Sequence, residues 1–185
     1  MNHPSNIADL RNRCSQGEQF DYLFFWGHQA PKNGTINSSC LSQWYPSPFK
    51  IKGINYHTAE HWMMASKARL FSDNNSLDII LASTDPKTAK AQGRKVKNFD
   101  PKIWNDKSRY LVTEGNLAKF SQNKNLADFL LSTNQKIIVE ASPFDKIWGI
   151  GLAASNEKAK NPNTWNGTNI LGFALMDVRS IYKAS

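Results

Sequence analysis

Two charged side chains share one face of a segment whose composition is typical of a helix. Glu60 and Lys67, with Met64 between them, follow an i, i+4, i+7 spacing, so in a helix they point the same way. A carboxylate there could transfer a proton or stabilise a positive charge, and the amine could bind a phosphate. Alternatively, Glu60 only stabilises the first helical turn beside Thr58, where the helix dipole favours an acid. Spacing alone favours this structural interpretation.

A strongly basic segment follows at residues 86–110. It holds eight cationic side chains and two carboxylates, so its net charge is +6, which is most of the chain's net charge of +8. The cations are Lys87, Lys90, Arg94, Lys95, Lys97, Lys102, Lys107 and Arg109. Trp104 lies among them, so a flat ring could stack on the indole while the cations bind phosphates. A solvated helical face is an equally good explanation of the segment, because most runs of charge have that role.

Two irregular loops late in the chain combine tryptophan with glycine. The first loop, residues 145–151, reads DKIWGIG, and the second, residues 161–169, reads NPNTWNGTN. Aromatic side chains on ordered loops often line binding sites, and glycine lets a ligand approach the backbone closely. The second loop leads into the last predicted helix, whose first amides could bind an anion. Both loops are therefore candidate parts of a binding site.

The composition excludes several classes of protein. The chain has 185 residues, of which 40% are hydrophobic and 21% charged, as in an ordinary globular domain. Two cysteines, Cys14 and Cys40, cannot form a disulfide scaffold or a cysteine zinc site. His57 and His61 have the spacing of a zinc-binding pair, but no third ligand of the usual kind is near, so we expect no metal and no cofactor.

The overall charge and hydropathy patterns bear on partners and location. The positive net charge predicts an anionic partner, either a phosphate-bearing small molecule or a nucleic acid. The first residues lack the apolar core of a signal peptide, and no apolar run is long enough to span a membrane. We therefore expect a cytoplasmic protein with no membrane partner.

The elements that must position these residues are mostly helices. Strand patterns occupy residues 20–26 and 136–140, and a period-two pattern around Gly53 predicts a hairpin over residues 50–56. Helices are predicted over residues 59–71, 77–83, 86–92, 101–120 and 127–131, followed by a final helix with an apolar stripe from Leu171 to Tyr182.

The order of these elements indicates the fold class. Strands do not alternate regularly with helices, so we expect an α+β fold rather than a doubly wound sheet. Residues 19–185 should form a single helix-rich domain with a small, mainly antiparallel sheet. Residues 1–18 should form a polar amino-terminal tail that is frayed or loosely docked.

Four blocks of sequence, spread over nearly the whole chain, form an ordered pattern. They read YHTAEHW at residues 56–62, GRKV at residues 93–96, VEASPFDKIWGIGL at residues 139–152 and WNGTNILG at residues 165–172. Together these blocks resemble the NADAR family, also described as YbiA-like. The order of the blocks and the length of the third make the resemblance specific, and it implies the fold of that family.

The resemblance also implies an N-glycosidase and assigns roles to particular residues. It implies that Glu60 is the catalytic carboxylate, with Asp145 as the candidate partner carboxylate. It also implies a set of candidate pocket residues, namely Lys67, Arg94, Trp104, Trp148 and Asn169. We add Trp26, Gly27 and Gly149 as candidates for substrate binding. The sequence departs from the family pattern at Trp62, where tyrosine is common, and in QWY at residues 43–45.

Three functions follow from the resemblance. The N-glycosidases of the NADAR family act on early riboflavin-pathway intermediates or remove ADP-ribose from guanine, including guanine in DNA. We favour hydrolysis of ADP-ribosylated guanine, in DNA or as a nucleotide, because the basic segment could bind further phosphates. An N-glycosidase of phosphoribosylamino-pyrimidines is the first alternative. A non-catalytic module that binds ADP-ribose or NAD is the second, disfavoured because Glu60 is present. Nothing in the sequence indicates an oligomeric state.

Overall fold

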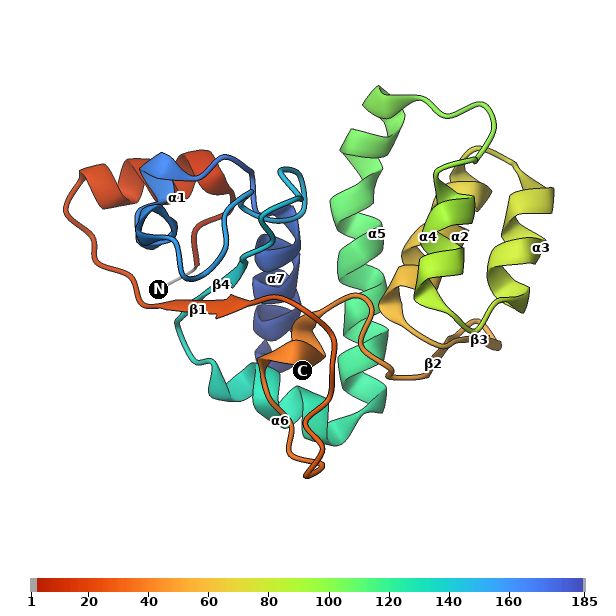
Figure 1. The fold of residues 1–185 in the computed structure, drawn as a ribbon, viewed down its shortest axis with the longest axis horizontal. Coiled ribbons are helices and arrows are strands. Elements are labelled where there is room, and N and C mark those ends of the chain that lie inside the picture. The colour runs from red at the N-terminus through yellow and green to blue at the C-terminus, as the bar shows by residue number, and fades with distance from the viewer. Residues whose placement is uncertain (1–2, 185) are drawn as a thin grey trace. The chain divides into compact units, whose positions relative to one another are not determined.

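The computed structural model describes residues 3–184, which divide into two compact units (Figure 1). We call residues 3–42 with 128–184 the terminal unit and residues 43–127 the central unit.

The chain forms mainly helices. They are α1 (Ile7–Ser15), α2 (Ala59–Leu70), α3 (Asn74–Ala82), α4 (Pro86–Gly93), α5 (Pro101–Gln122), α6 (Lys124–Ser132) and α7 (Ile170–Ala184), with short 3-10 turns η1 (Ser38–Leu41), η2 (Glu157–Lys160) and η3 (Pro162–Thr164). The strands are β1 (Tyr22–Phe25), β2 (Phe49–Ile51), β3 (Ile54–Tyr56) and β4 (Ile137–Glu140). The predicted helix-rich α+β class is confirmed.

The strands pair in two separate two-stranded sheets. β2 and β3 form the predicted antiparallel hairpin, with Lys52 and Gly53 both at positive φ in the tight turn between them. β1 and β4 pair in parallel, with Tyr22 opposite Ile137. The expectation of one mainly antiparallel sheet therefore holds for only one of the two pairs. Parallel partners lie far apart in the chain, and nothing local in either strand indicates which segment will join it.

The core of the terminal unit lies where α7 packs on β4 (Figure 1). Ile137, Ile138 and Val139 are fully buried, which suits β-branched residues in a strand. Helix and strand approach so closely at Gly172 that a Cβ there would lie 2.1 Å from the carbonyl oxygen of Ile138. Only glycine fits at this crossing, and the close packing fixes the loop that leads into α7.

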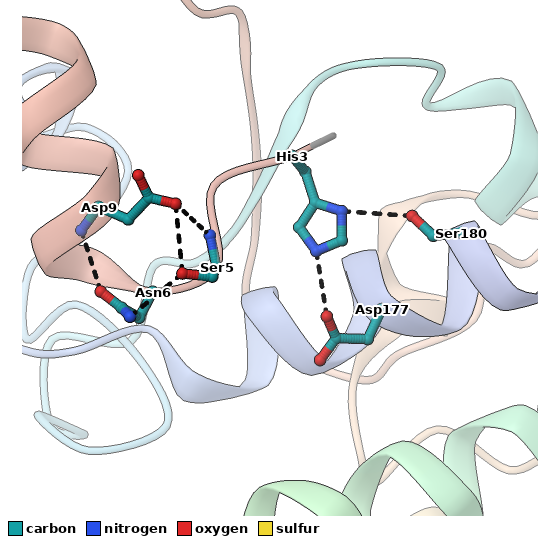
Figure 2. A network of polar contacts seen from close by, with 6 residues as sticks. All are labelled: His3, Ser5, Asn6, Asp9, Asp177 and Ser180. Carbon is teal, nitrogen blue, oxygen red and sulfur yellow. Dashed lines mark hydrogen bonds and ion pairs between the residues drawn. The ribbon is translucent and has the colours of Figure 1, made fainter. Parts of the chain in front are cut away.

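The amino-terminal segment, residues 3–18, packs against the rest of the terminal unit. Asn6 caps α1 with its side chain, and Leu10 is fully buried. His3 lies against α7, with Nε2 3.1 Å from Asp177 Oδ1 and Nδ1 3.2 Å from Ser180 Oγ (Figure 2). Of the tail predicted to be frayed or loosely docked, residues 3–18 thus contain a capped helix with polar contacts to α7, and residues 1–2 lie outside the described residues. A short polar helix with one buried leucine gives little sequence signal, because tertiary packing supplies most of its stability.

Helix α2 is enclosed nearly all round within the central unit. Thr58 caps it, as predicted, and nine of its twelve residues are buried. α3, α4, α5 and β3 pack around it. A Cβ at Gly93 would lie 2.0 Å from Met64 Sδ, and one at Gly115 would lie 2.1 Å from Trp62 Cδ1. A helix enclosed in this way can hold a charged side chain away from water.

The starts of α4 and α5 were also predictable. Asp85 accepts hydrogen bonds from the backbone N–H groups of Lys87 and Thr88, and Asp100 accepts them from Lys102 and Ile103. Each aspartate is followed by a proline, which is preorganised for the first helical position. Both predicted helices are confirmed. No helix among residues 3–184 is both long and apolar enough to cross a lipid bilayer.

Candidate functional site

Glu60 stands in the first turn of α2, with only 4% of its surface exposed. Its backbone N–H donates to the carbonyl oxygen of Gln43 at 2.9 Å. The amino end of a helix favours a negative charge, and removal from water strengthens the action of that charge on nearby groups. The position therefore meets a requirement for a carboxylate that stabilises developing positive charge.

A pair of buried amide side chains fixes the chain segment beside Glu60. Gln43 Nε2 donates to Asn116 Oδ1 at 3.0 Å, and Asn116 Nδ2 donates to Gln43 Oε1 at 3.3 Å. Asn116 Nδ2 also donates to the carbonyl oxygen of Val112 at 2.8 Å, within α5. Helix α5 thereby holds the residue whose carbonyl accepts from Glu60. Sequence reasoning did not give Gln43 this role, although its departure from the family pattern marked the position.

Lys67 lies near two aromatic rings of the central unit. Its Nζ is 3.9 Å from the ring centroid of Phe99 and 5.8 Å from that of Trp104. The ammonium makes no ion pair within residues 3–184, and burial lowers the pKa of Lys67 from its ordinary value of 10.5. The structure thus joins two predicted pocket residues, Lys67 and Trp104. Phe99, which is partly exposed, carried no sequence signal beyond its place in the basic segment.

The two neighbouring histidines have different environments. His61 is buried, and its Nδ1 is 2.8 Å from the hydroxyl of the capping residue Thr58. Its Nε2 has no hydrogen-bond partner among residues 3–184. Burial, followed by the charge of His57, lowers the pKa of His61 and favours the neutral ring. The described residues hold no cluster of three or more His, Cys, Asp or Glu side chains placed to bind a metal ion.

The basic segment presents most of its cations to solvent. Lys87, Arg94, Lys95, Lys97 and Lys102 are exposed and make no ion pair within the described residues. Arg94 follows directly after α4, at the end of that helix. The exposed cations of the segment can therefore attract polyanions.

The loop after β4 is held together by its own polar side chains. Ser142 Oγ accepts from the backbone N–H groups of Phe144 and Asp145, at 3.3 and 3.2 Å. Asp145 Oδ1 accepts from those of Ile147 and Trp148, at 2.9 and 2.7 Å. Asp145 therefore holds the loop in its fold through Oδ1.

Gly149 and Asn169 join this loop to the start of α7. A Cβ at Gly149 would lie 2.7 Å from the carbonyl oxygen of Glu140, so the backbone passes too closely for a side chain. Asn169 is fully buried, at a φ of 55°. Its Oδ1 accepts from the N–H of Glu140 at 3.0 Å, and its Nδ2 donates to the carbonyl oxygen of Ile138 at 2.9 Å. Its side chain therefore fastens the loop to β4.

Trp26 and Gly27 follow directly after β1, in the terminal unit. Trp26 is 58% exposed, and its ring centroid lies 6.1 Å from that of Phe144, which is 84% exposed. Gly27 has a φ of 84°, which a side chain would strain. Sequence reasoning proposed Trp26 and Gly27 but missed Phe144, because exposure of an aromatic residue is not readable from its type.

The predicted site residues thus fall into two groups. Glu60, Lys67, Arg94 and Trp104 belong to the central unit, whereas the other candidates, Trp26, Gly27, Asp145, Trp148, Gly149 and Asn169, belong to the terminal unit. The terminal unit also has a hollow of about 470 Å³, lined by residues that include Arg13, Glu18 and Lys136. None of the predicted site residues lines that hollow.

Comparison with known proteins places the chain in a family. The NADAR domain matches residues 24–182, which include every predicted site residue. The chain belongs to the NADAR family. An N-glycosidase of Acanthamoeba polyphaga mimivirus is 45% identical over 163 residues, which cover 85% of this chain and 94% of that protein. Protein irg-1 of Caenorhabditis elegans is 34% identical and covers 77% of this chain and 75% of its own length.

A solved member of the NADAR family has the same fold. The NMR structure of Escherichia coli YbiA matches with a TM-score of 0.67 and 24% identity, over 90% of this chain and 88% of the other. The E. coli protein is named an N-glycosidase, and 71% of this chain aligns with 74% of it at 29% identity. These relatives confirm the predicted enzyme class, a hydrolase of N-glycosyl bonds. None of the names specifies the glycoside.

Proposed function

We propose that the protein hydrolyses the ribose–nitrogen bond of ADP-ribosylated guanine, in DNA or as a nucleotide, with Glu60 as the catalytic carboxylate. The observation that carries the proposal is the place of Glu60, in the first turn of an enclosed helix and 4% exposed. The exposed cations of the basic segment favour a substrate with several phosphates.

The chemistry requires a negative charge close to the sugar. As the bond between C1′ and the base nitrogen breaks, its electrons leave with the base and the sugar becomes an oxocarbenium-like cation. Glu60 would stabilise that cation and take a proton from the attacking water, whose oxygen bonds to C1′. The departing base takes a proton from solvent, and Glu60 then returns its own proton to solvent, so one water molecule is consumed and the carboxylate is restored. Asp145 is the proposed partner carboxylate, with Oδ2 as the acting atom, because Oδ1 accepts from two backbone amides.

The remaining candidates would bind the two ends of the substrate. Lys67 would bind a phosphate, since its ammonium is half-buried and has only aromatic rings near it among the described contacts. Arg94 would bind a second phosphate, and Trp104 or Trp148 would stack on the base. Trp26, Gly27 and Gly149 would contact the substrate. Asn169 would support the site through the loop that it fastens to β4.

A second candidate function is favoured by Lys67 alone. One half-buried ammonium suffices to bind the single phosphate of a phosphoribosylamino-pyrimidine, a riboflavin-pathway intermediate. The basic segment would then have no part in catalysis. A third candidate, a non-catalytic module that binds ADP-ribose or NAD, would bind such ligands and release no base.

A direct comparison of substrates tests these proposals. The purified protein is incubated with DNA carrying ADP-ribosyl-guanine, with ADP-ribosylated GMP and with a phosphoribosylamino-pyrimidine, and base release is measured by chromatography. We expect the largest kcat/KM for an ADP-ribosyl-guanine substrate. Faster cleavage of the pyrimidine compound would replace the first function with the second. Binding of ADP-ribose with no cleavage of any glycoside would support the third.

A further inference from the structure

We propose that Trp26 and Phe144 form a stacking site for an unmodified nucleobase of single-stranded DNA. The proposal rests on the proposed function, since it assumes a nucleic acid substrate. It adds a residue, Phe144, and a ligand class that the family match does not supply. The two rings contact each other at 6.1 Å between centroids and are inclined by 54°.

The exposure of these two rings calls for an explanation. Single exposed apolar side chains are common on protein surfaces. Here, two large rings from segments far apart in the chain meet while 58% and 84% of their surfaces remain exposed. Each aromatic side chain could bury about 150–250 Å² on contact with a ligand. The pair therefore offers two exposed aromatic faces, inclined to each other, that the terminal unit does not use for its own packing.

The backbone that carries these rings is well ordered. Trp26 follows β1, and the N–H of Ala141, just after β4, donates to the carbonyl oxygen of Phe25 at 2.8 Å. Phe144 lies in the turn that Ser142 closes. Both rings thus stand beyond the carboxyl ends of the two paired parallel strands. Rings held in place before binding lose little conformational freedom when a ligand stacks on them.

The charge of the loop that carries Phe144 suits a nucleotide. Lys146 lies in the same loop, is exposed and makes no ion pair among the described residues. The neighbouring carboxylate of Asp145 is bonded to the loop's own amides. Exposed aromatic rings and a cation on one loop match the two parts of a nucleotide, a base and a phosphate. A protein partner is disfavoured, because a stable protein interface needs about 800 Å² from each side, far more than two rings provide.

Removal of one ring tests the proposal. The affinity of a fluorescent, unmodified single-stranded DNA hexanucleotide is measured by anisotropy for the wild type and for Phe144→Ala. Loss of a base–ring stack should weaken binding about 5- to 150-fold. Phe144→Tyr keeps the ring and should bind within about twofold of the wild type. An unchanged affinity in Phe144→Ala would overturn the proposal.

Two further controls separate stacking from general contact and from charge. Ile147 is 57% exposed in the same loop and has no ring, so Ile147→Ala should lose much less affinity than Phe144→Ala. A hexanucleotide of abasic sites has the same charge but no bases, and with it the wild type and Phe144→Ala should bind equally. Equal losses in the two loop variants, or a persistent difference with the abasic strand, would overturn the proposal.

The proposed function is judged by a separate measurement, turnover of ADP-ribosylated GMP. That small substrate has no neighbouring base, so Phe144→Ala should cleave it at the wild-type rate. A failure of the wild type to cleave any ADP-ribosyl-guanine substrate would overturn the proposed function. The hexanucleotide result would still decide whether the rings bind a base.

Discussion

The two regions that contain the family's sequence blocks use their polar residues differently. In the terminal unit, Asp145 is hydrogen-bonded to the backbone of its own loop, and Asn169 is hydrogen-bonded to the backbone of β4. In the central unit, the ammonium of Lys67 meets only aromatic rings among its described contacts, and the carboxylate of Glu60 is buried in the first turn of a helix. The first two residues hold the backbone in place, whereas the second two keep charged groups partly or wholly out of water. A family motif therefore does not by itself separate catalytic from architectural residues.

The largest expected effect tests whether the Glu60 carboxylate takes part in catalysis. Glu60→Gln keeps the shape of the side chain but removes its charge, so ligand binding should persist while turnover falls about 100-fold or more. The rate is measured in single-turnover experiments with whichever N-glycoside the wild type cleaves fastest. Glu157→Gln is the matched control, because Glu157 is exposed and pairs only with Lys160 in the described structure. A near-normal rate for Glu60→Gln would remove Glu60 from the mechanism.

The next effect tests the architectural side. Asn169→Ala deletes two buried hydrogen bonds. It also leaves an alanine at a φ of 55°, where the amide of asparagine no longer offsets the backbone strain. We expect the free energy of unfolding to fall by about 2–4 kcal/mol, measured in urea. Asn169→Gly loses the same hydrogen bonds but relieves the backbone, so it should be about 1 kcal/mol less destabilised than the alanine variant. If Asn169→Ala instead kept full stability and lost only substrate affinity, Asn169 would belong with the ligand-binding residues.

Much of the central unit could be predicted because its signals are local. Thr58, Asp85 and Asp100 each cap a helix where the sequence predicts a start. Helix α2 contains no glycine, proline or β-branched residue, and it runs from Ala59 to Leu70 against the predicted residues 59–71. Capping and propensity act over a few residues, so a single sequence contains them fully.

The features that could not be predicted depend on distant partners. The parallel pairing of β1 with β4 and the docking of α1 arise from contacts between segments far apart in the chain. The same limit applied to the candidate site. The sequence placed Lys67 and Trp104 together only through the family resemblance, and it gave no sign that Phe99 would lie closer to Lys67 than Trp104 does. The fastening role of Asn169 likewise depends on β4, which precedes it by a long loop.

A smaller effect tests whether Lys67 binds phosphate. Lys67→Met keeps much of the apolar stem but removes the charge, so KM should rise about tenfold or more while kcat changes little. Lys160→Met is the matched control, since Lys160 is exposed, lies outside the basic segment and pairs with Glu157 at 2.9 Å. Equal KM values in Lys67→Met and the wild type would return Lys67 to a packing role.

The pH dependence of binding gives the same residue an independent test. Burial lowers the pKa of Lys67 from 10.5, so its ammonium loses its proton at a lower pH than an exposed lysine would. Affinity for a phosphate-bearing ligand should be full below this lowered pKa and fall as the pH rises through it. Lys67→Arg stays charged to about pH 12, so the fall should disappear in that variant. A fall of the same size in Lys67→Arg would show that another group causes it.

The smallest expected effect is on the salt dependence of DNA binding, measured after lysines are removed from one unit or from the other. Lys87, Lys95 and Lys102 are exposed in the basic segment, and replacing all three with glutamine should lower the salt slope of single-stranded DNA binding by about 2, at about 0.7 per lost phosphate contact. The control replaces three exposed lysines of the terminal unit, Lys32, Lys158 and Lys183, which changes the net charge equally. If the basic segment contacts DNA directly, only the first variant changes the slope. Equal changes in both variants would mean that net charge alone attracts DNA, and the preference for a nucleic acid over a small phosphoribosyl substrate would lose its support.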